Sequence, residues 1–178
     1  MRPRMLSVLL VSATFSPVMA EEDDAEKKAI AKIRECGALV LEIAQNDKRL
    51  DVSYITAQGK VTNELLAPLK DLKRLANLNL RGAEITDEGL APISKQKTLV
   101  RLHLEKTKIT DKGLEQLKEL ENLEYLNVYG TEITDAGLEP LHALKKLKSL
   151  YLWQTKVTDE GVKKLQEALP ELKIIRGT

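Results

Sequence analysis

One six-residue motif recurs through this chain at a constant interval: Ile85-Thr86-Asp87-Glu88-Gly89-Leu90. It returns as Ile109-Thr110-Asp111-Lys112-Gly113-Leu114, as Ile133-Thr134-Asp135-Ala136-Gly137-Leu138 and as Val157-Thr158-Asp159-Glu160-Gly161-Val162. A weaker copy, Val61-Thr62-Asn63-Glu64-Leu65-Leu66, precedes them, and the copies start 24 residues apart without slippage. Such self-similarity predicts a repeat architecture, in which stacked units share one core.

A second motif precedes each of the last four copies. It reads Leu75-x-x-Leu78-x-Leu80 at its first occurrence and recurs over residues 99–104, 123–128 and 147–152. The alternation of leucines at its end predicts a short strand, because alternate residues of a strand face the same side. After two of the Thr-Asp pairs leucines stand three apart, as in Leu114, Leu117 and Leu120, which predicts a short helix with one apolar stripe.

The helix boundaries can be predicted from the same alignment. A threonine followed by aspartate begins each predicted helix, and both residue types favour helix N-caps. These N-cap candidates are Thr86, Thr110, Thr134 and Thr158. Three prolines, at 68, 92 and 140, occupy one position within the helices. Because proline forfeits a backbone hydrogen bond, we expect short helices or helices that open with a 3₁₀ turn.

Stacking these units predicts an α/β solenoid. Neighbouring strands lie about 4.8 Å apart, whereas packed helices need about 8–10 Å. The stack should therefore curve, with a parallel sheet on its concave face and short helices on its convex face. We expect a right-handed solenoid of about five repeats over residues 50–178. Leu172 to Ile175 is expected to form the strand that closes it.

Residues 50–178 resemble the leucine-rich-repeat family, whose signature is Leu-x-x-Leu-x-Leu-x-x-Asn/Cys-x-Leu. The Ile-Thr-Asp-x-Gly-Leu segment is similar to repeats of F-box-type adaptors and of short exported bacterial proteins of the planctomycete type. The chain departs from the signature at its Asn/Cys position, which holds Ala83, Thr107, Thr131 and Thr155. A threonine hydroxyl can bond the turn backbone there, whereas Ala83 cannot. The resemblance implies a binding module, and we do not extend the adaptors' ubiquitin-ligase role to this chain.

The first 49 residues divide into two segments. Residues 1–20 begin with Arg2 and Arg4, continue with a short apolar run and end in Val18-Met19-Ala20, an order typical of a secretory signal peptide. We therefore expect an exported protein, periplasmic or secreted, that is not inserted in a membrane after cleavage. Residues 21–49 should form an N-terminal cap, with an amphipathic helix that stops near Gly37 and the first strand of a hairpin.

Composition argues against several classes of function. The 28 basic and 27 acidic residues nearly balance, so no overall field favours nucleic acid. Cys36 is the only cysteine and cannot form an internal disulfide. The two histidines, His103 and His142, belong to no cluster with metal-ligand spacing, and no phosphate loop or nucleophile motif is present. We expect no catalytic residues, no metal and no cofactor, and therefore no enzyme.

The outward positions of the strands carry the candidate site. The mature chain has five aromatic residues, and strand phase places four of them on the concave face: Tyr125, Tyr129, Tyr151 and Trp153. Asn127 lies between them in the same phase, and a polar flank of Arg101, His103 and Glu105 precedes them. Tyrosine and tryptophan are enriched at binding hot spots. Cross-strand aromatic pairing that only stabilises the sheet is the alternative.

Three functions remain open at this stage. The first is a protein- or peptide-binding module, which uses the four aromatic residues together with Asn127 and the polar flank. The second is a glycan-binding module, in which Trp153 and Tyr129 stack on sugar rings. The third is a structural module in a surface or periplasmic assembly, although we expect a monomer.

Overall fold

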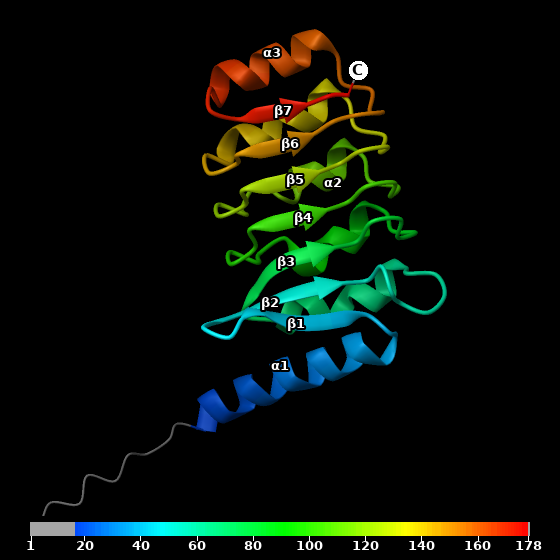
Figure 1. Cartoon of the computed structure of the whole chain (residues 1–178), viewed down its shortest axis with the longest axis vertical. Helices are drawn as coiled ribbons and strands as arrows, with labels where there is room; N and C mark the ends of the chain where they lie inside the picture. Colours follow the sequence, from blue (N-terminus) through cyan, green and yellow to red (C-terminus); the bar gives the residue numbers. More distant parts are fainter. Residues whose placement is uncertain (1–16, 178) are drawn as a thin grey trace, which may run out of the picture.

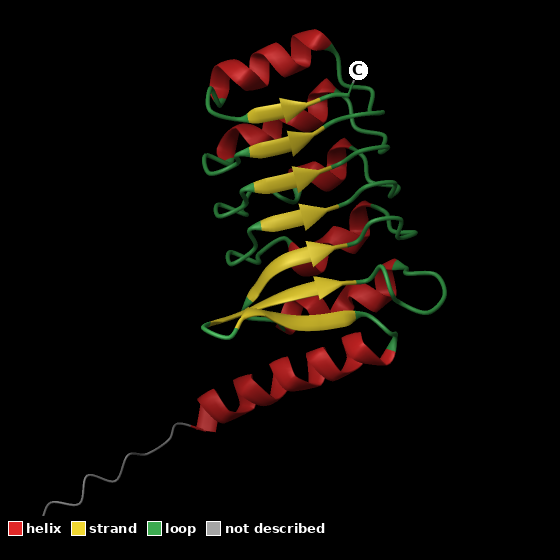
Figure 2. Ribbon diagram, in the orientation of Figure 1, coloured by secondary structure: helices red, strands yellow, loops and turns green. Residues whose placement is uncertain are grey.

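The computed structural model describes residues 17–177, which form a stack of strands and short helices (Figure 1). In chain order the elements are α1 (Pro17–Glu35), β1 (Leu39–Ala44), β2 (Asp47–Ser53), η1 (Asn63–Asp71), β3 (Leu75–Asn79), η2 (Asp87–Ile93), β4 (Arg101–His103), α2 (Asp111–Glu115), β5 (Tyr125–Asn127), η3 (Asp135–Ala143), β6 (Ser149–Tyr151), α3 (Asp159–Ala168) and β7 (Lys173–Ile175), where η marks a 3₁₀ helix. The seven strands form one sheet in chain order, and the helices after β2 cover one side of it (Figure 2).

The register of the sheet follows the sequence repeat. From β3 to β7 every pair is parallel and joins residues 24 positions apart, as in Leu78 with Leu102 and Leu102 with Leu126. These leucines are fully buried, and each contributes about 1.5–3 kcal/mol through burial of its side chain. The predicted solenoid, its parallel sheet and its closing strand are therefore confirmed. We call the outward side of the sheet the strand face and the opposite side the helix face.

The type of each helix depends on proline. The three helices that contain Pro68, Pro92 or Pro140 are 3₁₀ helices. The two repeats with Gln116 or Lys164 at the same position form the α-helices α2 and α3. This confirms the prediction, and the reason is the missing backbone donor of proline.

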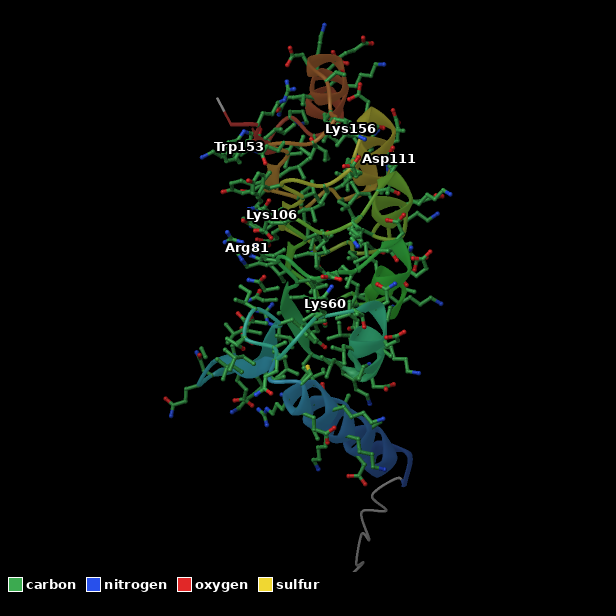
Figure 3. The ribbon with its side chains drawn as sticks, turned by 90° about the vertical axis from the view of Figure 1, so that its right-hand side faces the viewer. Lys60, Arg81, Lys106, Asp111, Trp153 and Lys156 are labelled. Carbon is green, nitrogen blue, oxygen red and sulfur yellow. The ribbon has the colours of Figure 1, made fainter. Side chains whose placement is uncertain are left out.

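The Thr-Asp pairs join neighbouring repeats rather than only capping their own helix. Asp111 accepts hydrogen bonds from the backbone N–H and the hydroxyl of Thr134 in the next repeat, at 2.8 and 2.7 Å. Asp87 binds Thr110 and Asp135 binds Thr158 in the same way. We call these contacts the aspartate ladder. It lies on the helix side of the stack, where Figure 3 labels Asp111.

The predicted N-caps are only half confirmed. The hydroxyls of Thr134 and Thr158 accept from N–H groups of their own helices, Ala136 N and Gly161 N. Those of Thr86 and Thr110 make no cap hydrogen bond, so the prediction is wrong there. Their hydroxyl groups bond side chains instead, and the Thr110 hydroxyl donates to Asp87.

The cap at the start of the stack consists of α1 and the antiparallel hairpin of β1 and β2. Ala29 and Ile33 of α1 are buried against the core, and Gly37 ends the helix region with a φ of +83°. Glu26 is also buried, and its carboxylate accepts from Lys73 N at 2.9 Å and from Arg74 Nε at 3.2 Å. These contacts fix the cap to the first repeat.

Most of the predicted signal peptide lies outside the described residues. Residues 17–20 are described, as the first turn of α1. No helix among residues 17–177 is long and apolar enough to span a bilayer.

Candidate functional site

Three columns of side chains cross the strand face, because paired residues recur every 24 positions. The first column contains Asn77, Arg101, Tyr125, Ser149 and Lys173, and the second contains Asn79, His103, Asn127, Tyr151 and Ile175. The third column follows the strand ends and contains Arg81, Glu105, Tyr129, Trp153 and Gly177. The structure thus brings all eight predicted site residues together on β4, β5 and β6 and the residues after them.

Tyr125 is the centre of the first aromatic group. Its ring lies 4.8 Å from that of His103 and 5.3 Å from that of Tyr151, measured between centroids. The guanidinium carbon of Arg101 lies 4.1 Å from the Tyr125 centroid, a cation–π contact. Partial burial raises the pKa of the Tyr125 hydroxyl, although its hydrogen bond from Asn127 opposes the change. The hydroxyl is therefore neutral at physiological pH and can donate a hydrogen bond.

Trp153 is the centre of the second aromatic group. Its ring stacks on that of Tyr129, with 5.1 Å between centroids and 19° between planes. On the other side Gly177 lies against the indole, since a Cβ there would come within 2.7 Å of three atoms of its five-membered ring. Lys106 Nζ lies 5.6 Å from the centroid of Tyr129. The faces of both rings are therefore partly covered, while Trp153 remains 48% exposed.

Glu105 differs from its predicted role. Its side chain was expected to contact a ligand, but the residue is only 6% exposed. One carboxylate oxygen lies 2.9 Å from His103 Nδ1 and accepts from Asn127 Nδ2 at 2.8 Å. The other oxygen is buried and has no hydrogen-bond partner among the described residues. We correct the prediction: Glu105 holds His103 and Asn127 in place and does not form part of the contact surface.

Two groups of exposed residues on the sheet were not among the predicted site residues. Arg81 and Lys106 project from the strand face, together with Trp153 (Figure 3). Lys106 was missed because its φ of +56° turns it out of strand phase. Glycines at the same position in other repeats, Gly82 and Gly130, were the signal for this turn.

The second missed group lies on the hairpin, far from the aromatic residues. Leu39, Leu41 and Ile43 alternate along β1 and are 39–58% exposed, as is Ile55 beyond β2. Val40 between them is buried. Because successive residues of a strand face opposite sides, the burial of Val40 implies that Leu39 and Leu41 face outward.

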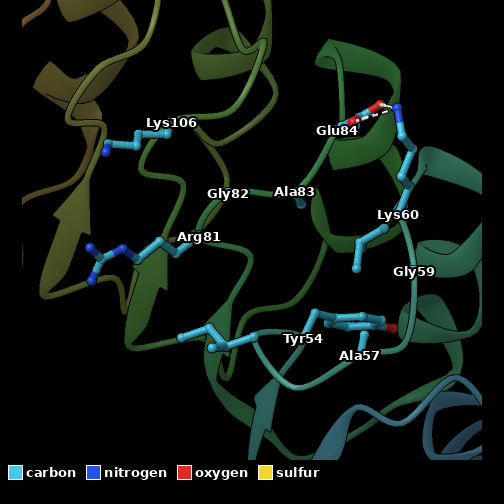
Figure 4. A pocket seen from close by; sticks show the side chains of 11 residues that line it. Tyr54, Ala57, Gly59, Lys60, Arg81, Gly82, Ala83, Glu84 and Lys106 are labelled. Carbon is cyan, nitrogen blue, oxygen red and sulfur yellow. Dashed lines mark hydrogen bonds and ion pairs between the residues drawn. The ribbon is translucent and has the colours of Figure 1, made fainter.

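A cavity of about 490 Å³ lies between the loop after β2 and the turn after β3 (Figure 4). Tyr54, Gly59 and Ala83 line it, and Lys60 on its rim forms an ion pair with Glu84 at 2.9 Å. Arg81 and Lys106 line it on the side opposite Lys60 (Figure 4). The loop before Val61 is two residues longer than its counterparts, because Val52 and Val61 are nine positions apart whereas Leu78 and Ile85 are seven apart. The cavity follows from this longer loop.

The described residues offer no metal centre, since no three His, Cys, Asp or Glu side chains among them gather closely enough to hold an ion. The strand face instead presents aromatic edges, amide groups and guanidinium groups. Such a surface can bind but has no evident nucleophile and base in contact.

These features define a class of protein. A family model described as "Leucine Rich repeat" matches residues 75–94, 95–118 and 119–141. Residues 75–141 are therefore leucine-rich repeats, and the 24-residue repeat continues on both sides of this matched segment. Members of this family typically bind proteins and are generally non-catalytic.

Two solved structures are similar to part of the chain. An internalin from Listeria monocytogenes aligns with 63% of this chain and 37% of its own, at 19% identity and a TM-score of 0.45. The PEPR1–AtPEP1 structure aligns with 75% of this chain and 19% of its own, at 17% identity and a TM-score of 0.49. This chain spans less than half the length of either, and similarities this slight carry no argument about its ligand. No curated protein matches the chain.

Proposed function

We propose that this chain is a binding module that recognises a protein or peptide through the C-terminal half of its strand face. One observation carries the proposal: all aromatic side chains of residues 17–177 except the buried Tyr54 gather on β5, β6 and the residues that follow them. The core is filled by leucine, isoleucine and valine and does not need them. An exposed tryptophan beside tyrosine and amide groups is the composition of an interface hot spot.

The ring contacts favour a protein or peptide over a glycan. A sugar that stacks needs a free ring face, but Trp153 lies between Tyr129 and Gly177, and Tyr129 lies between Trp153 and Lys106. The groups left open are ring edges, the indole N–H and tyrosine hydroxyls. These groups suit backbone and side-chain hydrogen bonds. The aromatic residues also pair across neighbouring strands, and this pairing stabilises the sheet that presents them.

Affinity capture tests this function. The wild-type chain and the double variant Tyr129→Ala/Trp153→Ala are immobilised and exposed to an extracytoplasmic extract of the native source. We expect a protein recovered by the wild type to be lost with the double variant, since truncating a hot-spot aromatic costs about 2 kcal/mol or more. Lys163→Ala on α3 is the control. Equal recovery by all three proteins, with unchanged circular dichroism, would show that the aromatic residues are structural only.

We also propose that the chain is exported, on the strength of the signal-like order in residues 1–20. N-terminal sequencing of the protein from its native source should find a mature chain that begins near Glu21. A mature chain that still begins at Met1 would contradict export by cleavage.

A further inference from the structure

The carboxylates of the strand face are already engaged. Asp51 on β2 accepts from Asn77 Nδ2 at 2.9 Å. Glu105 is buried and holds His103 and Asn127. Across the three columns from β2 to β7 there is no other acidic side chain. The strand face therefore offers no exposed, unbonded carboxylate to a ligand.

Whereas these carboxylates are hydrogen-bonded, several cations of the strand face have no charged partner among the described residues. Arg81, Arg101 and Lys106, and Lys173 at the far end of the sheet, are exposed, and none of them takes part in an ion pair among the described residues. Arg101 and Lys106 contact only tyrosine rings, at 4.1 and 5.6 Å from the centroids. Elsewhere on the molecule lysines pair with carboxylates repeatedly, as Lys148 does with Glu124 and Lys164 with Glu160. A ligand would find positive charge here without a competing partner.

The positions of these cations relate them to the aromatic residues. Arg81, Arg101 and Lys106 lie on or directly after β3 and β4, and the aromatic residues lie on β5 and β6. Adjacent strands are about 4.8 Å apart. These three cations therefore border the aromatic cluster on the side that faces the hairpin. An extended segment of a few residues can contact both groups at once.

We infer that the partner presents an acidic segment with an adjacent apolar side chain, an inference that rests on the proposed function. The acidic groups would bind Arg81, Arg101 and Lys106, and the apolar side chain would contact the edges of Tyr129 and Trp153. Opposite charge across an interface accelerates encounter and selects the partner. A single-stranded nucleic acid fits less well, because its bases stack on open aromatic faces and the ring faces here are partly covered.

Two peptide pools test the inference. Both contain fluorescein-labelled peptides of about twelve residues, long enough when extended to cross the sheet, with the same apolar and aromatic content. One pool carries Asp and Glu at its polar positions and the other carries Lys and Arg. Anisotropy at low and physiological salt measures affinity. We expect the acidic pool to bind at least about tenfold more tightly, with a preference that shrinks as salt rises. Fluorescence of Trp153, the sole tryptophan, reports binding at the site.

A matched pair of triple variants assigns the preference to these residues. Arg81→Gln/Arg101→Gln/Lys106→Gln should remove most of the preference for the acidic pool. Lys95→Gln/Lys118→Gln/Lys163→Gln removes the same number of charges from the helix side, where these exposed lysines form no ion pair with a described residue. This control should retain the wild-type preference. Equal losses in both triple variants would mean that only net charge matters and would overturn the inference.

The remaining outcomes separate this inference from the proposed function. Equal binding of the two pools, tighter binding of the basic pool, or no binding of either overturns the acidic partner. The proposed function still stands in these cases if the aromatic double variant loses a captured protein. Tighter binding of dextran sulfate or of an oligothymidylate than of the acidic pool would also overturn the peptide assignment, because the anionic ligand would then belong to another class.

Discussion

At the scale of single residues, the repeat imposes conformations that not every residue tolerates. The third position after each of β3 to β6 adopts a left-handed backbone, with φ of +73° at Gly82 and +69° at Gly130. Lys106 and Gln154 adopt it at +56° and +54°. A left-handed conformation costs a residue with a Cβ about 1–2 kcal/mol. Two repeats therefore keep a strained residue where glycine would fit.

Replacing Gln154 by glycine should stabilise the protein. Relief of the left-handed strain, about 1–2 kcal/mol, exceeds the entropic cost of glycine, about 0.5–1 kcal/mol. We expect the free energy of unfolding, measured by urea denaturation, to rise by about 0.5–1 kcal/mol. Lys118→Gly, at an exposed position without positive φ, is the control and should lose about as much. A loss of stability in both variants would refute the strain argument.

The glycines of the Thr-Asp-x-Gly motif have no room for a side chain, because an Asp or Asn of the preceding repeat lies against them. A Cβ on Gly161 would clash with the carboxylate of Asp135, and its three nearest atoms all belong to that side chain. Gly89, Gly113 and Gly137 are in the same position relative to Asn63, Asp87 and Asp111. The glycine and the aspartate of the motif therefore form a pair across repeats.

A double-mutant cycle can measure this pairing. Gly161→Ala should destabilise the protein by about 1–3 kcal/mol, as overpacking does. In the Asp135→Ala background the same change should cost at least about 1 kcal/mol less, because the carboxylate is gone and alanine favours the helix. Thermal unfolding of the four proteins gives the coupling. Additive losses would show that the clash lies elsewhere.

At the scale of elements, the aspartate ladder connects each helix start to the next. The hydrogen bonds from the hydroxyl and the backbone N–H of Thr158 hold the pKa of the Asp135 carboxyl below its ordinary value. A carboxyl whose pKa is lowered on folding binds fewer protons in the folded than in the unfolded protein. Its stabilisation is thus complete above the ordinary pKa of 3.8 and is lost as the pH falls through the lowered value.

Asparagine at this position should remove that pH dependence. The first rung shows that the geometry is possible, because Asn63 accepts from Thr86 N at 3.0 Å and donates to its hydroxyl at 2.8 Å. We expect Asp135→Asn to fold normally and to lose less stability than the wild type between about pH 5 and pH 2. Asp71→Asn, at an exposed aspartate without a described partner, should keep the wild-type slope. If all three proteins lost the same stability over this acidic range, the proposed role of the aspartate ladder would be contradicted.

A second ladder, made of ion pairs between loops of neighbouring repeats, has the same 24-residue period. Residues 60, 84, 108, 132 and 156 are Lys, Glu, Lys, Glu and Lys in turn. Lys60 pairs with Glu84 and Lys156 with Glu132. Because the charges alternate, each observed neighbour pair is attractive, whereas a shift of the stack by one repeat would bring like charges together. This ladder therefore favours the observed register of the repeats.

At the scale of the whole molecule, one buried core runs from α1 to α3. Each repeat contacts only its neighbours, so cooperativity depends on the interfaces between repeats. The core is continuous from Ile33 in the cap to Leu165 in the last helix, and both are fully buried. We therefore expect the chain to unfold as one unit.

A substitution at one end tests that expectation at the other. Leu66→Ala in η1 should lower stability by about 2–5 kcal/mol, through lost burial and a cavity. Unfolding followed by Trp153 fluorescence, near the C-terminal end, and by circular dichroism should shift to the same midpoint. An unchanged fluorescence midpoint would show that the two ends unfold separately.

The sequence alone determined the repeat, its strands and the residues on the strand face, because a 24-residue period and side-chain alternation are local properties. It also gave the 3₁₀ character of the proline-containing helices, since proline removes a donor in any context. The sequence did not predict the contacts between repeats. Asp111 bonds Thr134 and buried Glu105 bonds Asn127, and the two residues of each pair lie 23 and 22 positions apart along the chain.

Only the tertiary structure decided which outward residues can meet a ligand. Stacking places Trp153 between Tyr129 and Gly177 and covers part of its ring faces. It removes Glu105 from the surface and adds Lys106 through a left-handed turn. The physical reason is that strand phase fixes the side of the sheet, whereas exposure and charge pairing depend on neighbours contributed by other repeats.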